Sequence, residues 1–465
     1  MDIKILGAAG GEVTGSAYCV RTRDASVLID AGMFQGGRQS EAKNRLPPAA
    51  RPDQLDAVLL THAHLDHSGR IPLLIKHGFQ GPVFATEASI DLAGIILRDA
   101  ARLQVQDVER TNRKRRERGQ SPIEPLYEPE HVDPFPQMAQ AVPFHKPIPV
   151  AKGMTARWIE AGHMFGSGCI ELTVEEAGKR KVIVFSGDLG PTTMPILRPY
   201  EHFEKADMVF LESTYGDRDH RPYDETVAEF ERIVKQVVAA KGKILVPTFA
   251  IGRSQQILYH LAVMFLQKKV PHFPVYLDSP MAIEATKVYN KHPDLFDDEF
   301  KAWQKKGLSA VTRDTCRPTA TAAESMKLND VKGPCIILAG AGMCNAGRIL
   351  HHLKHNLDKP TTHVMIVGYQ GDGSLGRQLV DRRTQVTIHQ RRIQVRAQIH
   401  TLNGFSGHAG KSELLQWFSS LAPAKPQVVL THGEDGPRAA LGRAILQKHR
   451  ITCRLPRLGE VIELS

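Results

Sequence analysis

The sequence predicts an α/β protein in which a doubly wound, parallel-sheet domain is inserted into a strand-rich domain. Its 465 residues exceed what one hydrophobic core usually supports, so two domains are expected. Short strands dominate residues 1–208, strands alternate with helices over residues 209–384, and short strands return over residues 385–465. Because strands that alternate with helices are typical of βαβ units, the middle segment predicts a mainly parallel sheet.

The first segment contains eight short apolar runs that predict strands. In chain order they are IKILG, AYCVRT, SVLIDAG, AVLLTH, PVFAT, TARWIEAGH, CIELTV and KVIVFSGD. Helical patterns interrupt these runs at about residues 68–78 and 87–115.

The middle segment contains five apolar runs, each followed by a helical pattern such as RSQQILYHLAVMFLQ. These runs are MVFLES, KILVPTF, PVYLDS, CIILAG and HVMIVGY. The last segment predicts a single helix, KSELLQWFSSL, among short strands. Those strands are QVTIHQ, VRAQIHTL and QVVLTHGE.

Several features exclude membrane and secreted classes. No apolar run approaches the roughly 18 residues of a membrane span. The start of the chain, MDIKILGAAGG, lacks the basic-then-apolar layout of a signal peptide. The six cysteines are scattered without a C-x-x-C pair, which disfavours a disulfide framework or a thiolate zinc site. We therefore expect a cytoplasmic protein.

The formal net charge of +10 favours a polyanionic partner. Two segments concentrate basic residues, and each is equally compatible with a solvated helix face. The first, ERTNRKRRERG, precedes the proline-rich stretch SPIEPLYEPEHVDPFP, which predicts a loop, and contains Arg110, Arg113, Lys114, Arg115, Arg116 and Arg118. The second contains Arg382, Arg383, Arg391, Arg392 and Arg396.

The segment THAHLDHSGR places four potential metal ligands within six positions directly after a predicted strand. They are His62, His64, Asp66 and His67. A hydrophobic core would not select them, because each unpaired polar group that it buries costs a few kcal/mol, roughly 2–7. The quartet therefore predicts a metal site.

Three further ligands are expected at the ends of other strands, namely His163 in AGHMFGSG, Asp188 in SGDLG and His432 in VVLTHGE. Seven ligands suffice for two catalytic zinc ions if one carboxylate bridges them. We assign His62, His64 and His163 to the first ion. We assign Asp66, His67 and His432 to the second, with Asp188 shared. Asp30, at the end of SVLID, is expected to orient a ligand histidine.

On these motifs the chain resembles the metallo-β-lactamase superfamily: HAHLDH matches its His-x-His-x-Asp-His signature, with LIDAG, AGHMFGSG and SGDLG in the expected order. LESTYGDR, GFSGHAG and VVLTHGE resemble the three additional motifs of the β-CASP subfamily, whose members process nucleic acids. The resemblance implies a four-layer αβ/βα domain with an inserted β-CASP domain.

The resemblance also implies roles for residues of the additional motifs, which are Glu212, His408 and His432. RNA-processing members have a histidine in the third motif where DNA-processing members have a valine, so His432 implies an RNA nuclease. The chain is most similar to bacterial and archaeal relatives of the endonuclease that processes pre-mRNA 3′ ends. Two Zn²⁺ ions are the implied cofactors.

The implied reaction is hydrolysis of RNA by a two-metal hydroxide mechanism. Asp66, Glu212 and His408 are the expected catalytic residues. His408, paired with Glu212, suits protonation of the leaving ribose 3′-oxygen, because a carboxylate stabilises an imidazolium. The products would carry 5′-phosphate and 3′-hydroxyl ends, in RNA processing or decay, and both endonuclease and 5′-exonuclease activity remain open.

Substrate contacts are predicted in the middle segment at Ser279, Arg348 and Arg377. GDGSLG, residues 371–376, matches a dinucleotide fingerprint by form alone, because no acidic residue follows at about 20 positions. Its backbone amides could cradle an RNA phosphate, or the segment could be a simple turn.

Single-stranded RNA is the expected partner, with no membrane, and a homodimer is one assembly left open. Two other functions stay open as well: hydrolysis of a small thioester or lactam, and an inactive RNA-binding subunit.

Overall fold

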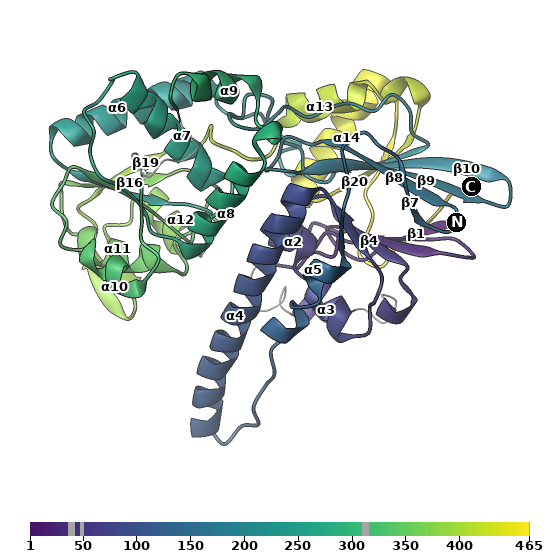
Figure 1. Ribbon diagram of the computed structural model, residues 1–465, viewed down its shortest axis with the longest axis horizontal. Coiled ribbons are helices and arrows are strands. Elements are labelled where there is room, and N and C mark those ends of the chain that lie inside the picture. The colour runs from purple at the N-terminus through teal and green to yellow at the C-terminus, as the bar shows by residue number, and fades with distance from the viewer. Residues whose placement is uncertain (36–41, 47–50, 309–315, 372, 465) are drawn as a thin grey trace. The chain divides into compact units, whose positions relative to one another are not determined.

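The computed structural model describes residues 1–35, 42–46, 51–308, 316–371 and 373–464. Asp372 of the GDGSLG segment lies outside the described residues. The described chain forms two compact units (Figure 1). Unit 1 consists of Met1–Thr192, Pro199–Asp219 and His408–Ser465, and unit 2 of Thr193–Arg198 and His220–Gly407.

Within the described residues, unit 1 contains two seven-stranded sheets. The first has the order β22 (Val461–Glu463), β1 (Asp2–Ile5), β2 (Tyr18–Arg21), β3 (Ser26–Ile29), β4 (Ala57–Leu59), β5 (Val83–Ala85) and β6 (Ala139–Ala141). The second has the order β21 (Cys453–Arg454), β20 (Gln427–Thr431), β11 (Met208–Glu212), β10 (Lys179–Phe185), β9 (Gly168–Glu176), β8 (Met154–Glu160) and β7 (Ile148–Ala151). In both sheets antiparallel pairs at one end give way to parallel pairs at the other.

The two sheets pack face to face over the main hydrophobic core of unit 1. Val27 and Leu59 of the first sheet belong to one buried cluster with Trp158, Ile170 and Phe185 of the second. The indole N–H of Trp158 donates to the carbonyl of Leu60 over 3.1 Å, and Leu60 lies two positions before the HAHLDH segment. The sandwich therefore holds that segment in place from both sheets.

Helices cover both outer faces of this sandwich. On the second sheet, Leu414 and Trp417 of α13 and Leu441 of α14 form a buried cluster with Val209 and Leu430. Figure 1 shows α2 to α5 beside the first sheet, on the side away from the second. The helices of unit 1 are α2 (Leu65–Ser68), α3 (Ile71–Lys76), α4 (Glu87–Glu117), α5 (Phe135–Met138), α13 (Lys411–Ser419) and α14 (Asp435–His449). The predicted four-layer αβ/βα architecture is confirmed.

Unit 2 is built around a parallel sheet of six strands, counted within the described residues. Its order is β14 (Arg317–Pro318), β13 (Val275–Leu277), β15 (Cys335–Ala339), β12 (Lys243–Pro247), β16 (Thr362–Ile366) and β19 (Gln398–Thr401). Every pairing in this sheet is parallel. A separate antiparallel pair joins β17 (Gln385–Ile388) to β18 (Arg391–Gln394).

Helices cover both faces of this parallel sheet too. Ile244 and Val246 pack with α6 and α7 on one face, whereas Leu245 packs with α11 and α12 on the other. The helices are α6 (Tyr223–Ala239), α7 (Arg253–Leu266), α8 (Pro280–Lys291), α9 (Asp298–Lys305), α10 (Ala322–Lys327), α11 (Arg348–Asn356) and α12 (Leu375–Val380). The predicted doubly wound sheet is confirmed. Short 3-10 turns lie at Pro52–Gln54, Pro129–His131, Pro293–Leu295 and Ala422–Ala424.

The unit boundaries differ from those read in the sequence. The MVFLES strand, read as the start of the inserted domain at residue 209, is β11 and pairs in parallel with β10 and β20 of unit 1. Residues 385–407, read as the return to the first domain, lie in unit 2, where β19 pairs with β16. An apolar run shows that a strand is buried but not which sheet it joins.

The prediction of a single helix after residue 385 is wrong. A second helix, α14, covers Asp435–His449. Its sequence, DGPRAALGRAILQKH, contains a proline and two glycines and has little amphipathic pattern. Pro437 is tolerated because it lies in the first turn, where a backbone N–H has no helical partner. Among the described residues no helix is long and apolar enough to cross a membrane.

Candidate metal centre

The predicted ligands all lie in unit 1, where strands of both sheets end. His62 and His64 follow β4, His163 follows β8, Asp188 follows β10 and His432 follows β20. Asp66 and His67 lie within the short helix α2. The structure brings all seven together, although they span 371 positions of the chain from His62 to His432, counted inclusively.

The first group consists of His62, His64, His163 and Asp188, whose ligand atoms all lie within 4.8 Å of one another. Nδ1 of His64 lies 3.1 Å from Nε2 of His62 and 3.0 Å from Nε2 of His163. Oδ2 of Asp188 lies 3.6 Å from Nε2 of His62 and 3.5 Å from Nε2 of His163. Three imidazole nitrogens and one carboxylate oxygen thus face a common point.

The second group consists of Asp66, His67 and His432. Nε2 of His432 lies 3.2 Å from Nε2 of His67 and 3.5 Å from Oδ2 of Asp66. The other oxygen of Asp188, Oδ1, lies 3.3 Å from Nε2 of His67. Asp188 therefore faces the first group with one oxygen and the second group with the other.

These spacings fit metal ligands. With Zn–N bonds of about 2.0–2.1 Å, two ligand atoms of a tetrahedral site lie about 3.3 Å apart. Oδ1 of Asp188 is buried and accepts no hydrogen bond from the part of the chain that the structure describes. A buried carboxylate oxygen among imidazoles, without a donor, is what a cation would satisfy. The residues fit a site for metal ions.

The pKa values of the buried histidines also support a site for metal ions. Burial lowers the pKa of His64 to about 4, which leaves its imidazole neutral and able to bind a metal. Burial would also lower the pKa of His67, but the carboxylates of Asp188 and Asp30 outweigh it and hold that pKa well above its usual value. Burial would raise the pKa of Asp188, yet His432, His67 and His408 hold it well below its usual value. The pocket thus demands positive charge between Asp188 and His67, which a proton or a metal ion can supply.

Asp30, predicted to orient a ligand histidine, lies beside His67. Its Oδ2 lies 2.7 Å from Nδ1 of His67, so the Nε2 atom of that ring points toward the second group. The Thr61 backbone N–H donates to Asp30 Oδ1 over 2.8 Å. The hydroxyl of Thr61 also lies 3.1 Å from Nδ1 of His62. Asp30 and Thr61 therefore orient one histidine of each group.

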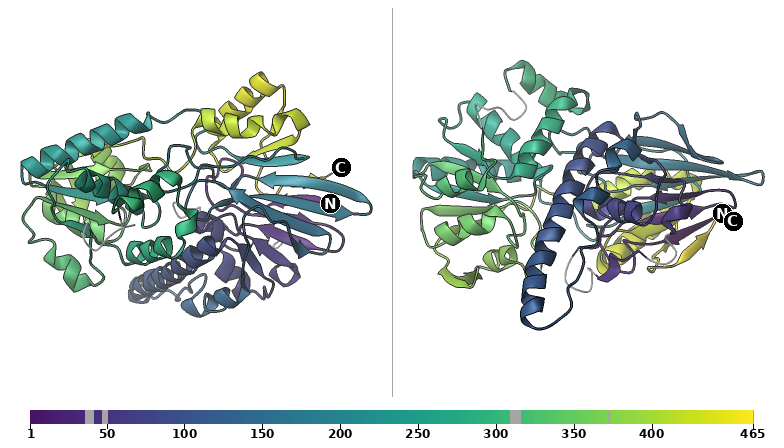
Figure 2. Two further views of the ribbon diagram at one scale, coloured as in Figure 1. Left: turned by 45° about the horizontal axis from the view of Figure 1, so that its top comes forward. Right: turned by 60° about the horizontal axis from the view of Figure 1, so that its bottom comes forward.

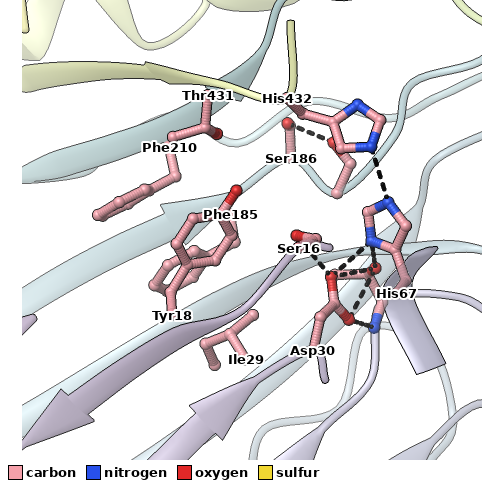
Figure 3. Close-up of a pocket in the computed structure, with 12 residues that line it drawn as sticks. Ser16, Tyr18, Ile29, Asp30, His67, Phe185, Ser186, Phe210, Thr431 and His432 are labelled. Atoms are coloured by element: carbon pink, nitrogen blue, oxygen red, sulfur yellow. Dashed lines mark hydrogen bonds and ion pairs between the residues drawn. The ribbon is translucent and has the colours of Figure 1, made fainter. Parts of the chain in front are cut away.

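A small cavity of about 10 Å³ lies behind the second group (Figure 3). Tyr18, Phe185 and Phe210 line its apolar side, and Asp30 and His67 line its polar side. The rings of Phe185 and Phe210 stack with their centroids 4.8 Å apart. A cavity of this size holds at most one water molecule. The packed core thus prevents the ligand side chains from relaxing inward.

His432 is held by its backbone and by a hydroxyl. Its φ of 50° lies in the left-handed region, which non-glycine residues rarely adopt. Its N–H donates to the carbonyl of Ala8 over 2.8 Å, and the hydroxyl of Thr214 lies 3.2 Å from its Nδ1. Asp30 has a similar φ of 57°. Such strain is retained where the surrounding structure requires one particular side-chain direction.

Glu212 and His408 form a pair beside the first group. Oε1 of the buried Glu212 lies 3.3 Å from Nδ1 of His408, and both its oxygens accept backbone N–H groups, from Leu189 over 2.9 Å and from Thr214 over 3.1 Å. Burial would lower the pKa of His408, but Glu212 and Asp188 raise it to about 9. The His408 side chain is 23% exposed, so it can reach a ligand in the centre.

The sequence analysis did not predict two hydroxyl residues that contact histidines of this centre, Thr61 and Thr214. Thr61 directly precedes His62, and Thr214 lies two positions after Glu212 in LESTYGDR. Their place inside the motifs is the only signal for them, because threonine at the end of a strand is common.

The three predicted substrate contacts lie in unit 2, and each has a partner within that unit. The Ser279 hydroxyl caps α8, and Nε of Arg377 donates to Asp381 over 2.9 Å. Arg348 donates to the buried Asp278 over 2.7 Å and to the carbonyls of residues 319 and 320. The GDGSLG segment leads into α12, whose first turn Ser374 caps.

Comparisons with known proteins cover almost the whole chain. The sequence model of the metallo-β-lactamase superfamily matches residues 10–248. The model of the Beta-Casp domain matches residues 254–379, and the model of the Zn-dependent metallo-hydrolase RNA specificity domain matches residues 392–456.

Curated relatives include Ribonuclease TTHA0252 of Thermus thermophilus, 39% identical over 466 residues that cover 99% of each chain. The transcription termination factor FttA of Methanocaldococcus jannaschii is 29% identical over 93% of this chain and 67% of its own. A solved structure of an Enterococcus faecalis protein of unknown function matches 100% of this chain and 99% of its own, with a TM-score of 0.55 at 14% identity. That structure supports the fold alone.

Gly32 allows the end of β3 to hold α2 and its two ligands. The N–H of Ala31 donates to the carbonyl of His67 over 2.7 Å, and the N–H of Met33 donates to that of Leu65 over 2.9 Å. A Cβ atom on Gly32 would lie 1.6 Å from the carbonyl oxygen of Asp66. No side chain fits between these two backbones.

We expect Gly32→Ala to destabilise the protein by about 1–3 kcal/mol, because overpacking forces the backbone apart, and to reduce bound metal. Thermal unfolding and metal analysis measure the two effects. Gly94→Ala, at an open position of α4 with nothing within 4 Å of the new Cβ, is the matched control. It should leave metal binding unchanged and raise stability by about 0.5–1 kcal/mol. Equal metal content in the two variants would contradict this role of Gly32.

Proposed function

The chain belongs to the metallo-β-lactamase superfamily and to its β-CASP branch, and on that premise we propose that it is a zinc-dependent ribonuclease using two metal ions. Membership makes it a metal-dependent hydrolase. The proposal adds the identity and number of the ions, single-stranded RNA as the substrate, and the chemical nature of the product ends.

The observation that carries the proposal is the pair of ligand groups joined by Asp188. Each group contains imidazoles directed at one side of the same carboxylate. Two ions held by groups that share a carboxylate would be able to act on one phosphate group. Histidine and carboxylate ligands without thiolates are typical of catalytic zinc.

His62, His64, His163 and Asp188 would hold the first ion. Asp66, His67 and His432 would hold the second, together with Asp188. When bound, such ions lower the pKa of water and polarise the phosphoryl oxygen that they contact. The surrounding residues would hold the ligand rings in position before a metal binds. Asp30, Thr61 and Thr214 each contact the Nδ1 atom of one imidazole, which leaves the Nε2 atom of that ring to face its ligand group.

His408, paired with Glu212, would supply the proton for the leaving group, which metal ions do not supply. Hydrolysis that leaves a 3′-hydroxyl must place a proton on the departing ribose oxygen. The Glu212 carboxylate holds Nδ1 of His408, and the side chain is partly exposed, so the imidazolium can donate that proton through Nε2. The oxygen of water stays on phosphorus, which gives the 5′-phosphate end.

The name of one relative and the description of one family model favour RNA hydrolysis as the activity to test first. Ribonuclease TTHA0252 matches over 99% of both chains, so nearly the whole of this chain has a counterpart in it. The model matching residues 392–456 is described as an RNA specificity domain.

The test is cleavage of one RNA sequence labelled separately at its two ends, with and without a chelator. We expect cutting that stops with chelator and resumes with Zn²⁺, and products that carry 5′-phosphate ends. The end-labelled fragments separate internal cutting from removal of nucleotides at the 5′ end. Single-stranded DNA of the same sequence should be cut far more slowly, because an RNA-specific site uses the 2′-hydroxyl. Equal rates on both strands would overturn the substrate class.

Purified protein should bind close to two zinc equivalents, as the two ligand groups require. Asp188→Ala should lose most of the activity and at least one equivalent, because this residue serves both groups. Metal analysis by mass spectrometry measures both. Active protein with one ion or none would contradict the two-metal assignment.

His408→Ala should keep both metal equivalents and the affinity for RNA but cut RNA about 10²–10⁴-fold more slowly, the usual loss for a general acid. Glu212→Gln should act in the same direction. Bis(4-nitrophenyl) phosphate is the matched control substrate, because its leaving group departs without a proton. The loss on this ester should be much smaller than the loss on RNA. Loss of metal from the His408 variant would make the residue a ligand instead.

A further inference from the structure

Helix α4 has two halves with different surroundings. Buried residues occur from Ala88 to Ala101 and stop there. The second half extends away from the sheets of unit 1, with the returning chain beside it (Figures 1 and 2). We call residues 102–128 the α4 arm. Because this half buries little apolar surface, the core of unit 1 does not explain why the helix continues.

The arm is a built structure rather than a frayed helix end. The side-chain amide of Asn112 donates to the carbonyl of Ile123 over 2.8 Å and accepts from its N–H over 2.9 Å. Nε of Arg115 donates to the carbonyl of Ser121 over 2.6 Å. Tyr127 is fully buried, which anchors the base of the returning segment.

An open hollow lies between the helix and the returning segment. Its lining residues are Glu109, Asn112, Arg113, Arg116 and Pro122, and its volume is about 450 Å³. Arg113 and Arg116 are three positions apart, so their side chains share a helix face. Neither forms an ion pair within the described chain, unlike Arg110, which pairs with Asp107 over 2.6 Å.

Cations near the C-terminal end of a helix interact favourably with its dipole. That effect accounts for basic residues at the C-terminus of α4. It does not account for the clamp formed by Asn112 or for a hollow between two segments. A solvated helix end needs neither the Asn112 contacts nor the hollow, so the arm is not explained as a solvated helix end alone.

We propose that the hollow of the α4 arm binds the phosphate backbone of RNA at a second site, away from the metal centre. The inference rests on the proposed ribonuclease function for the identity of the polyanion. A planar guanidinium donates two parallel N–H groups to a phosphate, and two guanidiniums on one helix face present such forks side by side. Pairing with phosphates would also relieve the repulsion between neighbouring cations.

The metal centre and the hollow of the α4 arm both lie in unit 1 and are separated along helix α4. The N-terminal end of α4 is tied to the loop that carries His163, because the hydroxyls of Thr86 and Ser89 donate to the carbonyl of Gly166 over 2.5 and 2.8 Å. From Thr86 to Arg113 the helix rises about 40 Å, at 1.5 Å per residue. A stacked strand at about 3.4 Å per nucleotide spans this distance with roughly 12 nucleotides. Only longer RNA can occupy both sites.

The test compares RNAs of about 6 and about 30 nucleotides, below and above that span. The double substitution Arg113→Gln and Arg116→Gln should weaken binding of the long RNA roughly tenfold or more. It should also reduce the salt dependence of that binding by about 0.7 per lost phosphate contact. Cleavage and binding of the short RNA should stay as in the unsubstituted protein.

The matched control is Arg443→Gln with Lys448→Gln, which removes the same charge from exposed positions of α14 in the same unit. Circular dichroism and thermal unfolding establish that both double variants are folded. Equal weakening in the control would reduce the effect to net charge and overturn the proposal. Unchanged binding of the long RNA by the arm variant would also overturn the proposal. An acidic protein surface would then be the next candidate ligand for the hollow. Equal loss on short and long RNA would also contradict a distant second site.

Binding is measured separately from cleavage, so failure of the two proposals can be told apart. If the protein binds long RNA through the arm but cuts neither RNA, the ribonuclease proposal fails and the arm proposal stands. If it cuts both RNAs and the arm variant behaves as the unsubstituted protein, only the arm proposal fails.

Discussion

The buried carboxylate of Asp188 is the constraint on which the rest of unit 1 depends. Its two oxygens face two separate groups of imidazoles, and Oδ1 has no hydrogen-bond donor among the described residues. A buried charge in that state is costly unless a cation joins it. The centre is thus organised around positive charge beside Asp188, which a metal ion or a proton on a histidine can supply.

The two-sheet sandwich meets this constraint by ending strands of both sheets at the same place. The first sheet supplies His62 and the α2 ligands after β4, and the second supplies Asp188 and His432 after β10 and β20. The packed core between the sheets keeps these ends from moving independently. The left-handed backbone at Asp30 and His432 is tolerated because this rigid surrounding holds it.

Positive charge also lies outside the metal centre, on helix α4. Helix α4 begins beside the loop of His163, to which Thr86 and Ser89 are hydrogen-bonded, and continues past the core to an exposed pair of arginines in the α4 arm. One helix therefore connects a site built for metal ions to a surface suited to phosphates. Both lie within unit 1, so their separation is set by the rise of a single helix.

The sequence by itself determined the strand-rich and alternating segments and the HAHLDH quartet as a candidate metal site, and it predicted His163, Asp188 and His432 as further ligands, because each of these is a local pattern of residue types. Only the tertiary structure decided which oxygen of Asp188 faces each group and that β11 joins the second sheet of unit 1. It also decided that Thr61 and Thr214 touch the ligand rings, and that Asn112 clamps the arm. The physical reason is range: periodicity and motif spacing report on neighbours along the chain. Sheet partners, carboxylate orientation and side-chain clamps are set by contacts between segments that are far apart in sequence or joined through a turn.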